Sequence, residues 1–117
     1  MENLLTHFAI NARDVHTSVE FYKNMFGFEV EYETEDWAEL KMKDGLELAI
    51  KKQFEGETTG SSGIGFVVRD CRKATDDLKA KGATIKKDCE VRENGTKLLT
   101  QITDPDGDVI WLVQNVK

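Results

Sequence analysis

The side chains of this chain that can bind or transform a small molecule are a histidine, an amide, two glutamates and two tryptophans. Imidazole nitrogens and carboxylate oxygens coordinate divalent metals, and a carboxylate also acts as a general base. Indole rings offer flat faces on which aromatic or cationic molecules stack. The set consists of His7, Asn11, Trp37, Glu39, Glu47 and Trp111. What these residues can do depends on whether the fold brings them to one surface.

Side chains alternate between the two faces of a β-strand, so parity separates a core face, which a helix covers, from an open face. Apolar residues mark the core face. Its predicted members are Phe8, Ile10, Ala12, Ala38, Leu40, Met42, Leu46, Leu48, Ile50, Ile110 and Leu112. The predicted open faces hold His7, Ala9, Asn11, Trp37, Glu39, Lys41, Glu47, Ala49, Val109, Trp111 and Val113. Parity therefore sends all six candidate side chains to open faces.

The elements that must position these residues occur twice along the chain. Residues 7–14 and 63–70 share one order of small, apolar and charged positions, and each segment predicts a strand followed by the start of a helix. Asp14 and Asp70 suit the N-cap of a helix, and Gly27 and Gly82 suit the left-handed residue that ends one. Between these signals the apolar residues at helical spacing are Val15, Val19, Tyr22 and Phe26, and then Cys71, Ala74 and Leu78.

Beyond each predicted helix the apolar pattern changes to a period of two, which is typical of strands. Residues 43–45 (Lys-Asp-Gly) predict a hairpin turn, and residues 104–107 (Asp-Pro-Asp-Gly) predict a type I turn. Residues 55–62 contain no apolar side chain and predict a flexible linker. The predicted strands are 28–34, 37–43 and 46–52 in the first half and 84–91, 97–103 and 109–114 in the second.

Three sequence motifs follow one another in a fixed order. Residues 18–28 read SVEFYKNMFGF, residues 78–83 read LKAKGA, and residues 104–107 read DPDG. With these motifs the chain resembles the vicinal oxygen chelate superfamily, which contains glyoxalases, bleomycin resistance proteins and dioxygenases. The resemblance implies an α+β fold of two βαβββ modules, 1–54 and 63–117. Their curved mixed sheets would surround a cleft, with the helices on the outer face, and the protein would be a homodimer.

The resemblance also implies where a metal would bind. Metal-dependent members supply His or Glu ligands from the first and the last strand of each module. His7 and Glu47 match two of these positions, whereas Gly63 and Trp111 occupy the other two. Two protein ligands hold a divalent ion only with help from water or substrate. The expectation for cofactors is therefore none, or a weakly held divalent metal.

Each candidate residue also has a purely structural interpretation. For His7 this interpretation, packing at a strand end with a bond to a backbone carbonyl, is favoured over metal binding. For Glu47 it is solvation or pairing with Lys41, which is favoured over a ligand role. The two tryptophans are compatible with sheet packing, although a ligand-stacking role for at least one of them is favoured because parity places both away from the core. His16, early in the first predicted helix, is expected to be exposed.

Composition excludes some partners. The formal net charge of -6 and the mixing of Lys with Asp and Glu argue against nucleic acid. No uncharged apolar run is long enough to span a membrane, and no signal peptide is visible at the N-terminus, so a cytoplasmic location is expected. Cys71 and Cys89 lack a CxxC spacing and are expected to be free thiols.

Three functional hypotheses follow, and the sequence leaves open whether the protein is an enzyme. The first is a metal-independent small-molecule-binding protein whose ligand contacts Asn11, Trp37, Glu39, Glu47 and Trp111. The second is a metal-dependent lyase or isomerase of the glyoxalase type that uses His7 and Glu47, the metal acting as a Lewis acid. The third, a non-catalytic interaction module, is allowed by the fold but has no sequence feature in its favour.

Overall fold

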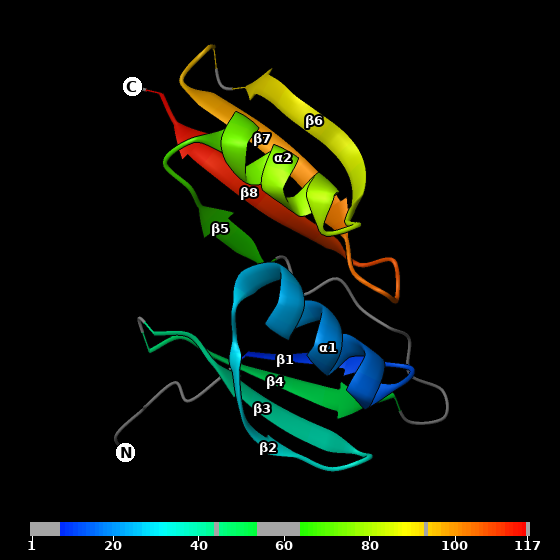
Figure 1. Ribbon diagram of the computed structural model, residues 1–117. Coiled ribbons are helices and arrows are strands. Elements are labelled where there is room, and N and C mark those ends of the chain that lie inside the picture. Colours follow the sequence, from blue (N-terminus) through cyan, green and yellow to red (C-terminus); the bar gives the residue numbers. More distant parts are fainter. Residues whose placement is uncertain (1–7, 44, 54–63, 93, 117) are drawn as a thin grey trace. The chain divides into compact units, whose positions relative to one another are not determined.

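The computed structural model describes residues 8–43, 45–53, 64–92 and 94–116, which form two units of one design (Figure 1). The units are Met1–Ser62 and Gly63–Lys117. Each contains a helix and a four-stranded mixed sheet in the chain order βαβββ. The α+β class and the repeated βαβββ plan predicted from the sequence are thereby confirmed. The predicted linker, 55–62, lies outside the described residues.

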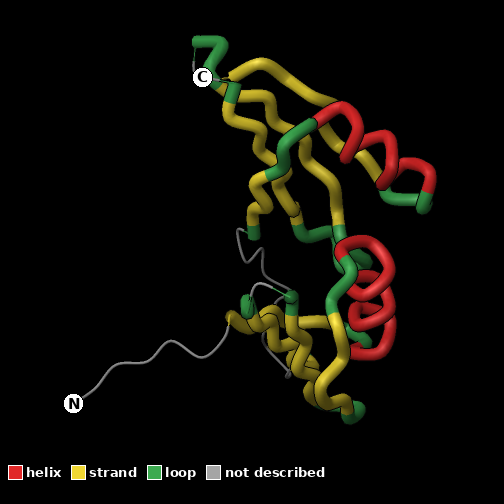
Figure 2. Tube along the Cα trace, turned by 60° about the vertical axis from the view of Figure 1, so that its left-hand side comes forward, coloured by secondary structure: helices red, strands yellow, loops and turns green. Residues whose placement is uncertain are grey.

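The first unit is built from β1 (Phe8–Ala12), α1 (Val15–Phe26), β2 (Glu29–Glu33), β3 (Trp37–Lys41) and β4 (Glu47–Lys52). Its sheet has the order β1-β4-β3-β2. The β1 and β4 strands run parallel, whereas β3 is antiparallel to both β2 and β4. The helix packs on β4, β2 and β3. One face of this sheet is therefore covered by α1, as the views in Figures 1 and 2 agree.

The second unit repeats this topology. It consists of β5 (Gly65–Val67), α2 (Cys71–Ala80), β6 (Thr84–Arg92), β7 (Lys97–Thr103) and β8 (Val109–Asn115). The sheet order is β5-β8-β7-β6, with β5 parallel to β8 and the other pairs antiparallel. The α2 helix packs on β6, β7 and β8. Each unit thus has one helix-covered face and one open face on its sheet.

The helix ends follow the predicted capping residues. The Asp14 and Asp70 carboxylates accept hydrogen bonds from the backbone N–H groups of Thr17 and Lys73, at 3.2 and 3.1 Å. These bonds satisfy donors that have no partner inside the helix. The α1 helix ends at Gly27, whose φ of +75° is left-handed. The expected N-caps and the first helix stop are confirmed.

The Asp-Pro-Asp-Gly turn before β8 also forms as predicted. The Gly107 N–H donates to the Asp104 carbonyl at 3.0 Å, which closes the turn. The Asp104 carboxylate accepts from the backbone N–H groups of Asp106 and Asp108, both at 2.9 Å. This side chain, which is 5% exposed, therefore holds the turn from inside.

Parity predicts most of the core of each unit. The fully buried apolar side chains include Val19, Leu40 and Ile50 in the first unit and Ile102, Ile110 and Leu112 in the second. Two expected core residues are corrected. Phe8 is 54% exposed because it begins an edge strand on which α1 does not principally pack, and Leu46 is 37% exposed because it precedes β4.

Bulges interrupt the strand register at three places. The pairing of β2 with β3 shifts between Val30 and Tyr32, and that of β6 with β7 shifts between Ile85 and Lys87 and again between Lys87 and Glu90. An extra residue in a strand reverses the face to which the following side chains point. Parity counted from the sequence therefore fails beyond the shift in β2 and between the two shifts in β6, where the second shift restores it.

Candidate functional site

The open face of the first sheet carries a tryptophan held by a carboxylate. Trp37 and Glu39 lie two residues apart on β3, so both side chains project from the same face. The Trp37 indole N–H donates to Glu39 Oε2 at 2.8 Å. Trp37 is half-buried and Glu39 is exposed. The hydrogen bond fixes the ring beside a negative charge that solvent reaches.

Neighbouring strands extend this face with charged residues. In the β3–β4 register Trp37 lies opposite Lys51, and Lys41 lies opposite Glu47. The parallel register of β1 with β4 places Asn11 opposite Lys51 as well. Four of the predicted ligand-binding residues, Asn11, Trp37, Glu39 and Glu47, therefore belong to one face of one sheet.

Ala49, predicted to line this open face, is fully buried. Its register partners are Ala9 on β1 and Glu39 on β3, and Glu47 and Lys51 flank it on its own strand. A methyl group in the middle of a sheet is covered by the longer side chains around it. Ala49 therefore leaves no side chain on the surface for a ligand to contact.

Tyr32 is a further aromatic residue of this face that sequence parity assigns wrongly. It has the parity of Phe28 and Val30, which would turn it toward the helix. The bulge after Val30 shifts the register, so that Tyr32 pairs with Glu39 and shares its open face. The phenol is 54% exposed. No signal in the sequence marks the bulge, which is why this residue was missed.

Trp111 belongs to the open face of the second sheet. It lies on β8 between Gln101 of β7 and Gly65 of β5. A Cβ added at Gly65 would lie 3.8 Å from the Trp111 Cβ, so the glycine leaves this side of the tryptophan without a neighbouring side chain. Trp111 is half-buried, whereas the adjacent Ile110 and Leu112 are core residues. Trp111 and Trp37 occupy different units of the chain.

The residues of the described chain fit a metal site poorly. Glu47 supplies one carboxylate, but the indole of Trp111 has no lone pair for a metal at the position where the resemblance implies a glutamate. No group of three or more His, Cys, Asp and Glu side chains in the described residues is arranged to hold a metal ion. His7, the other predicted ligand, lies outside the described residues.

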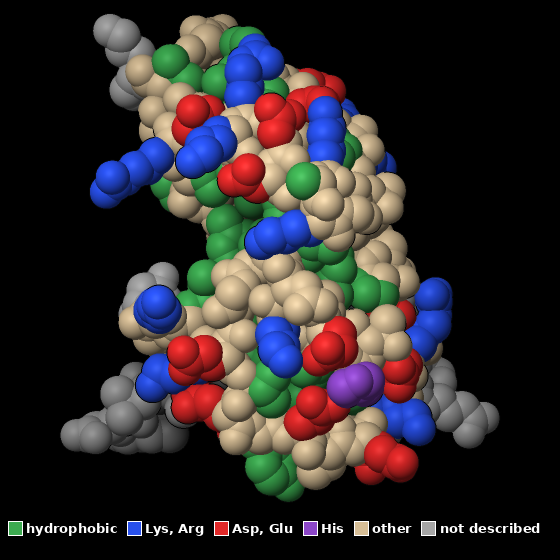
Figure 3. Space-filling model, in the orientation of Figure 1, with side chains coloured by type: hydrophobic (Ala, Val, Ile, Leu, Met, Phe, Trp, Pro, Cys, Tyr) green, Lys and Arg blue, Asp and Glu red, His purple; other side chains and the backbone are tan. Residues whose placement is uncertain are grey.

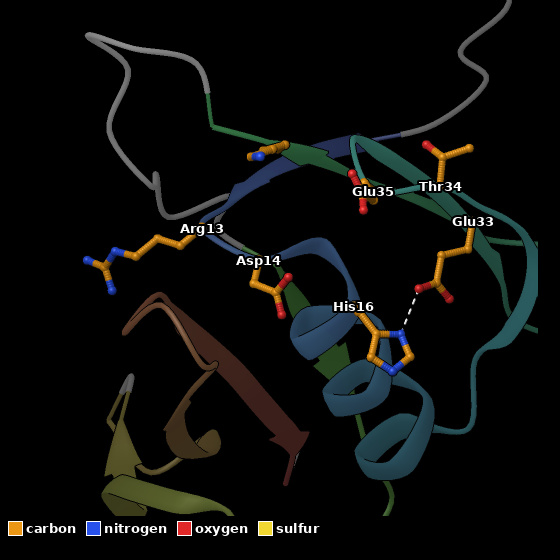
Figure 4. A pocket seen from close by; sticks show the side chains of 7 residues that line it. Arg13, Asp14, His16, Glu33, Thr34 and Glu35 are labelled. Atoms are coloured by element: carbon orange, nitrogen blue, oxygen red, sulfur yellow. Dashed lines mark hydrogen bonds and ion pairs between the residues drawn. The ribbon is translucent and has the colours of Figure 1, made fainter.

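A polar pocket of ≈ 690 Å³ opens elsewhere in the first unit (Figure 4). It is lined by Arg13, Asp14, His16, Glu33, Thr34, Glu35 and Lys52. None of these residues belongs to the predicted site. In Figure 4 the His16 ring points toward Glu33, whereas Arg13 extends away from the other labelled side chains. The lining contains no aromatic ring other than the imidazole.

Two carboxylates of this pocket, those of Glu33 and Asp14, have hydrogen-bond partners. His16 Nδ1 lies 2.7 Å from Glu33 Oε2, and this hydrogen bond, with the attraction of the carboxylate, raises the pKa of the imidazole. The Asp14 carboxylate accepts from the hydroxyl and the backbone N–H of Thr17, which lowers its pKa. His16 is exposed, as expected, with 68% of its side chain accessible. Figure 3 shows the histidine among acidic side chains.

Comparison with known proteins identifies the family. The family model described as the Glyoxalase/Bleomycin resistance protein/Dioxygenase superfamily matches residues 4–112. The chain belongs to this superfamily. No curated protein matches it with significance. No described helix of this superfamily member is long and apolar enough to cross a membrane.

Solved structures of the glyoxalase/bleomycin resistance superfamily share its fold. A member from Sphaerobacter thermophilus is 24% identical with a TM-score of 0.81, and 97% of this chain and 98% of that one are covered. Lactoylglutathione lyase from Agrobacterium tumefaciens is 16% identical with a TM-score of 0.78, over 97% and 94% of the two chains. A member from Nocardioides is 15% identical with a TM-score of 0.81, over 100% and 86%. At these identities the likeness is one of fold.

Proposed function

We propose that this member of the superfamily binds a small aromatic or cationic molecule on the open face of its first sheet and does so without a metal. The observation that carries the proposal is the hydrogen bond of 2.8 Å from the Trp37 indole to Glu39. An indole held in one orientation loses little conformational entropy when a ligand stacks on it. The adjacent carboxylate adds attraction for a positive charge.

The composition of the face supports the same chemistry. Tyr32 is registered with Glu39 and adds a second aromatic side chain, and Glu47 adds a second carboxylate. The pocket of Figure 4 is less suited to such a ligand, because two of its three carboxylates already bind His16 and Thr17. The Trp111 face offers a second stacking surface in the other unit.

Metal independence rests on the donor set. Trp111 brings an indole to one of the positions at which the family resemblance implies a ligand, and an indole does not coordinate a divalent ion. We therefore infer that the open face of the first sheet recognises its ligand by stacking and charge. Homodimer formation, which the family resemblance implies, and a cytoplasmic location, which the sequence suggests, remain part of the proposal.

The binding proposal is tested with a panel of aromatic and quaternary ammonium compounds by isothermal titration calorimetry, which needs no tryptophan as a reporter. The Trp37→Ala variant should bind such a compound about tenfold more weakly than the wild type does, because stacking on an indole contributes on the order of 1–2 kcal/mol. Glu39→Gln retains an oxygen that accepts from the indole but removes the charge. This variant should bind cationic compounds more weakly and neutral aromatic compounds with unchanged affinity.

The matched control is Glu33→Gln, which removes one carboxylate from the pocket of Figure 4. We expect it to leave binding unchanged. If Glu33→Gln bound the ligand more weakly and Trp37→Ala bound it normally, the ligand would bind in that pocket. This outcome would refute the proposal.

Metal independence is tested separately by thermal unfolding of chelator-treated protein with and without added Zn²⁺, Ni²⁺ or Co²⁺. We expect no increase in melting temperature, because a ligand raises it only by binding the folded state. An increase that disappears with both His7→Ala and Glu47→Ala would instead support the metal-dependent lyase or isomerase.

A further inference from the structure

The layer between α2 and its sheet contains both cysteines of the chain, in contact with each other. Cys71 is the first residue of α2, and Cys89 lies on β6. Their Sγ atoms are 3.6 Å apart. Cys71 is fully buried and Cys89 is 7% exposed, and both are free thiols. The contact lies in the second unit, on the helix side of its sheet and opposite the Trp111 face.

A bulge brings Cys89 into this layer. Lys87 pairs with Gln101 on the open face, and a regular strand from Lys87 onward would place Cys89 on that face too. The register shift between Lys87 and Glu90 adds a residue to β6, and Cys89 adopts a left-handed φ of +47°. Only a few per cent of non-glycine residues have a positive φ. The strand thus departs from regular geometry at the residue that meets the second thiol.

Two threonine hydroxyls surround the sulfur atoms. Thr100 Oγ1 lies 3.3 Å from Cys71 Sγ and 3.5 Å from Cys89 Sγ. Thr75 Oγ1 lies 3.5 Å from Cys89 Sγ and 2.8 Å from Thr100 Oγ1. A hydroxyl close to sulfur can donate a hydrogen bond to a thiolate, which is the reactive form of cysteine.

The hydroxyls keep other partners if the thiols are consumed. Thr75 donates to the Cys71 carbonyl at 2.7 Å, and Thr100 accepts from the Cys89 backbone N–H at 3.0 Å. Loss of both S–H groups therefore leaves no buried hydroxyl without a hydrogen bond. Oxidation of the two thiols therefore avoids the free-energy cost of burying an unpaired hydroxyl.

We propose that Cys71 and Cys89 are a redox site, in which hydrogen peroxide converts the two thiols into a reversible intramolecular disulfide. The sulfur of Cys89, the more exposed of the two residues, attacks the peroxide oxygen and becomes a sulfenic acid as water leaves. The Cys71 sulfur then attacks the Cys89 sulfur, the S–S bond forms, and the sulfenic oxygen leaves as a second water. Two thiols and one hydrogen peroxide give one disulfide and two waters.

The order of these steps follows from burial. An oxidant must reach the first thiol from solvent, and of the two only Cys89 has accessible surface. Burial raises the pKa of Cys71, so this thiol is poorly ionised at neutral pH and suits the second step, in which the electrophile is already in contact. The sulfur atoms must approach by about 1.5 Å to reach the length of a disulfide bond.

The test is mass spectrometry of the folded wild-type protein before and after treatment with hydrogen peroxide. We expect the mass of the protein to fall by about 2 Da and neither thiol to react with an alkylating reagent. Digestion should yield a cross-linked peptide pair containing Cys71 and Cys89, and dithiothreitol should restore both thiols. The oxidised protein should melt at a higher temperature, because the cross-link restricts the unfolded chain.

Single variants separate the two steps. With Cys71→Ser, peroxide should leave a sulfenic acid on Cys89 that dimedone traps, whereas the wild type should give no such adduct. With Cys89→Ser, the buried Cys71 should stay reduced. The wild-type measurement decides the proposal even if a variant folds poorly. Two reduced thiols in folded protein at a peroxide dose that oxidises urea-unfolded protein, or disulfide-linked dimers in place of the internal bond, would overturn it.

Discussion

At the scale of single residues, His16 connects the first turn of α1 to the end of β2. Its imidazole is 2.7 Å from Glu33, and the carboxylate raises the imidazole pKa above its ordinary value of 6.5. A group whose pKa is higher in the folded state binds its proton more tightly there. The stabilisation from this pair is therefore fully present below about pH 6.5 and is lost as the pH rises through the elevated pKa.

The first prediction concerns this pair. In Glu33→Gln the His16 pKa should fall toward its ordinary value, because the main cause of the shift is removed. An NMR titration of the imidazole protons measures this change, and the second histidine of the chain provides an internal reference. Glu29→Gln, on the same strand but absent from the contacts of His16, is the control. An unchanged His16 pKa in Glu33→Gln would contradict the assignment.

Residue types and parity predict much of the candidate site but not all of it. Trp37, Glu39 and Glu47 share an open face because β3 and β4 are regular strands, for which alternation holds. Tyr32 and Lys87 lie on faces opposite to those that parity indicates, because each follows a single register shift in its strand. A bulge depends on the pairing with the neighbouring strand, and the sequence of one strand does not encode it.

At the scale of elements, the ends of the helices are the most predictable features. Both N-caps are aspartates whose carboxylates accept backbone N–H groups, and these local bonds need no tertiary partner. The strand limits are predicted within two residues for most strands, and β7 is predicted at Lys97–Thr103 as observed. The strand predicted within residues 63–70 is also present, as the three-residue β5.

The second prediction is for the α2 N-cap. Asp70→Ala should lower the free energy of unfolding by about 1 kcal/mol, because the Lys73 N–H loses its acceptor. Asp70→Asn keeps an acceptor oxygen and should retain most of the stability. Urea unfolding followed by circular dichroism distinguishes the two variants. Equal losses for Ala and Asn would show that charge, and not the cap hydrogen bond, is responsible.

The third prediction is for the end of α2. Gly82 has a φ of +89°, and the Ala83 N–H donates to the Leu78 carbonyl at 3.0 Å to close the helix. Gly82→Ala should cost about 1 kcal/mol through backbone strain alone, because no atom lies within 4 Å of the added methyl group. Gly65→Ala, at a glycine without a positive φ, should cost less. The same urea unfolding measurement tests both variants.

At the scale of the whole molecule, the chain consists of two units with one tryptophan each. Trp37 reports on the first unit and Trp111 on the second. Conservative Trp→Phe variants leave one emitter at a time, so the unfolding of each unit can be followed within the full chain. The family match and the repeated topology show that both units follow one plan.

The fourth prediction uses these emitters. Ile50 lies in the core of the first unit and Ile110 in the core of the second, and both are almost fully buried. Ile50→Ala in a Trp111→Phe background should lower the stability reported by Trp37 by about 2–5 kcal/mol, because it leaves a cavity. Ile110→Ala in a Trp37→Phe background should have the same effect on Trp111. A loss below about 1 kcal/mol in either case would contradict the assigned core.

The brevity of β5 has a consequence for how the protein behaves at high concentration. This edge strand, Gly65–Val67, pairs with only three of the seven residues of β8, and its Val67 side chain is 76% exposed. A long, flat edge would recruit strands from other copies and seed aggregates. Three residues offer few backbone groups to an incoming strand, so we expect the exposed valine at this edge to contribute little to association between copies.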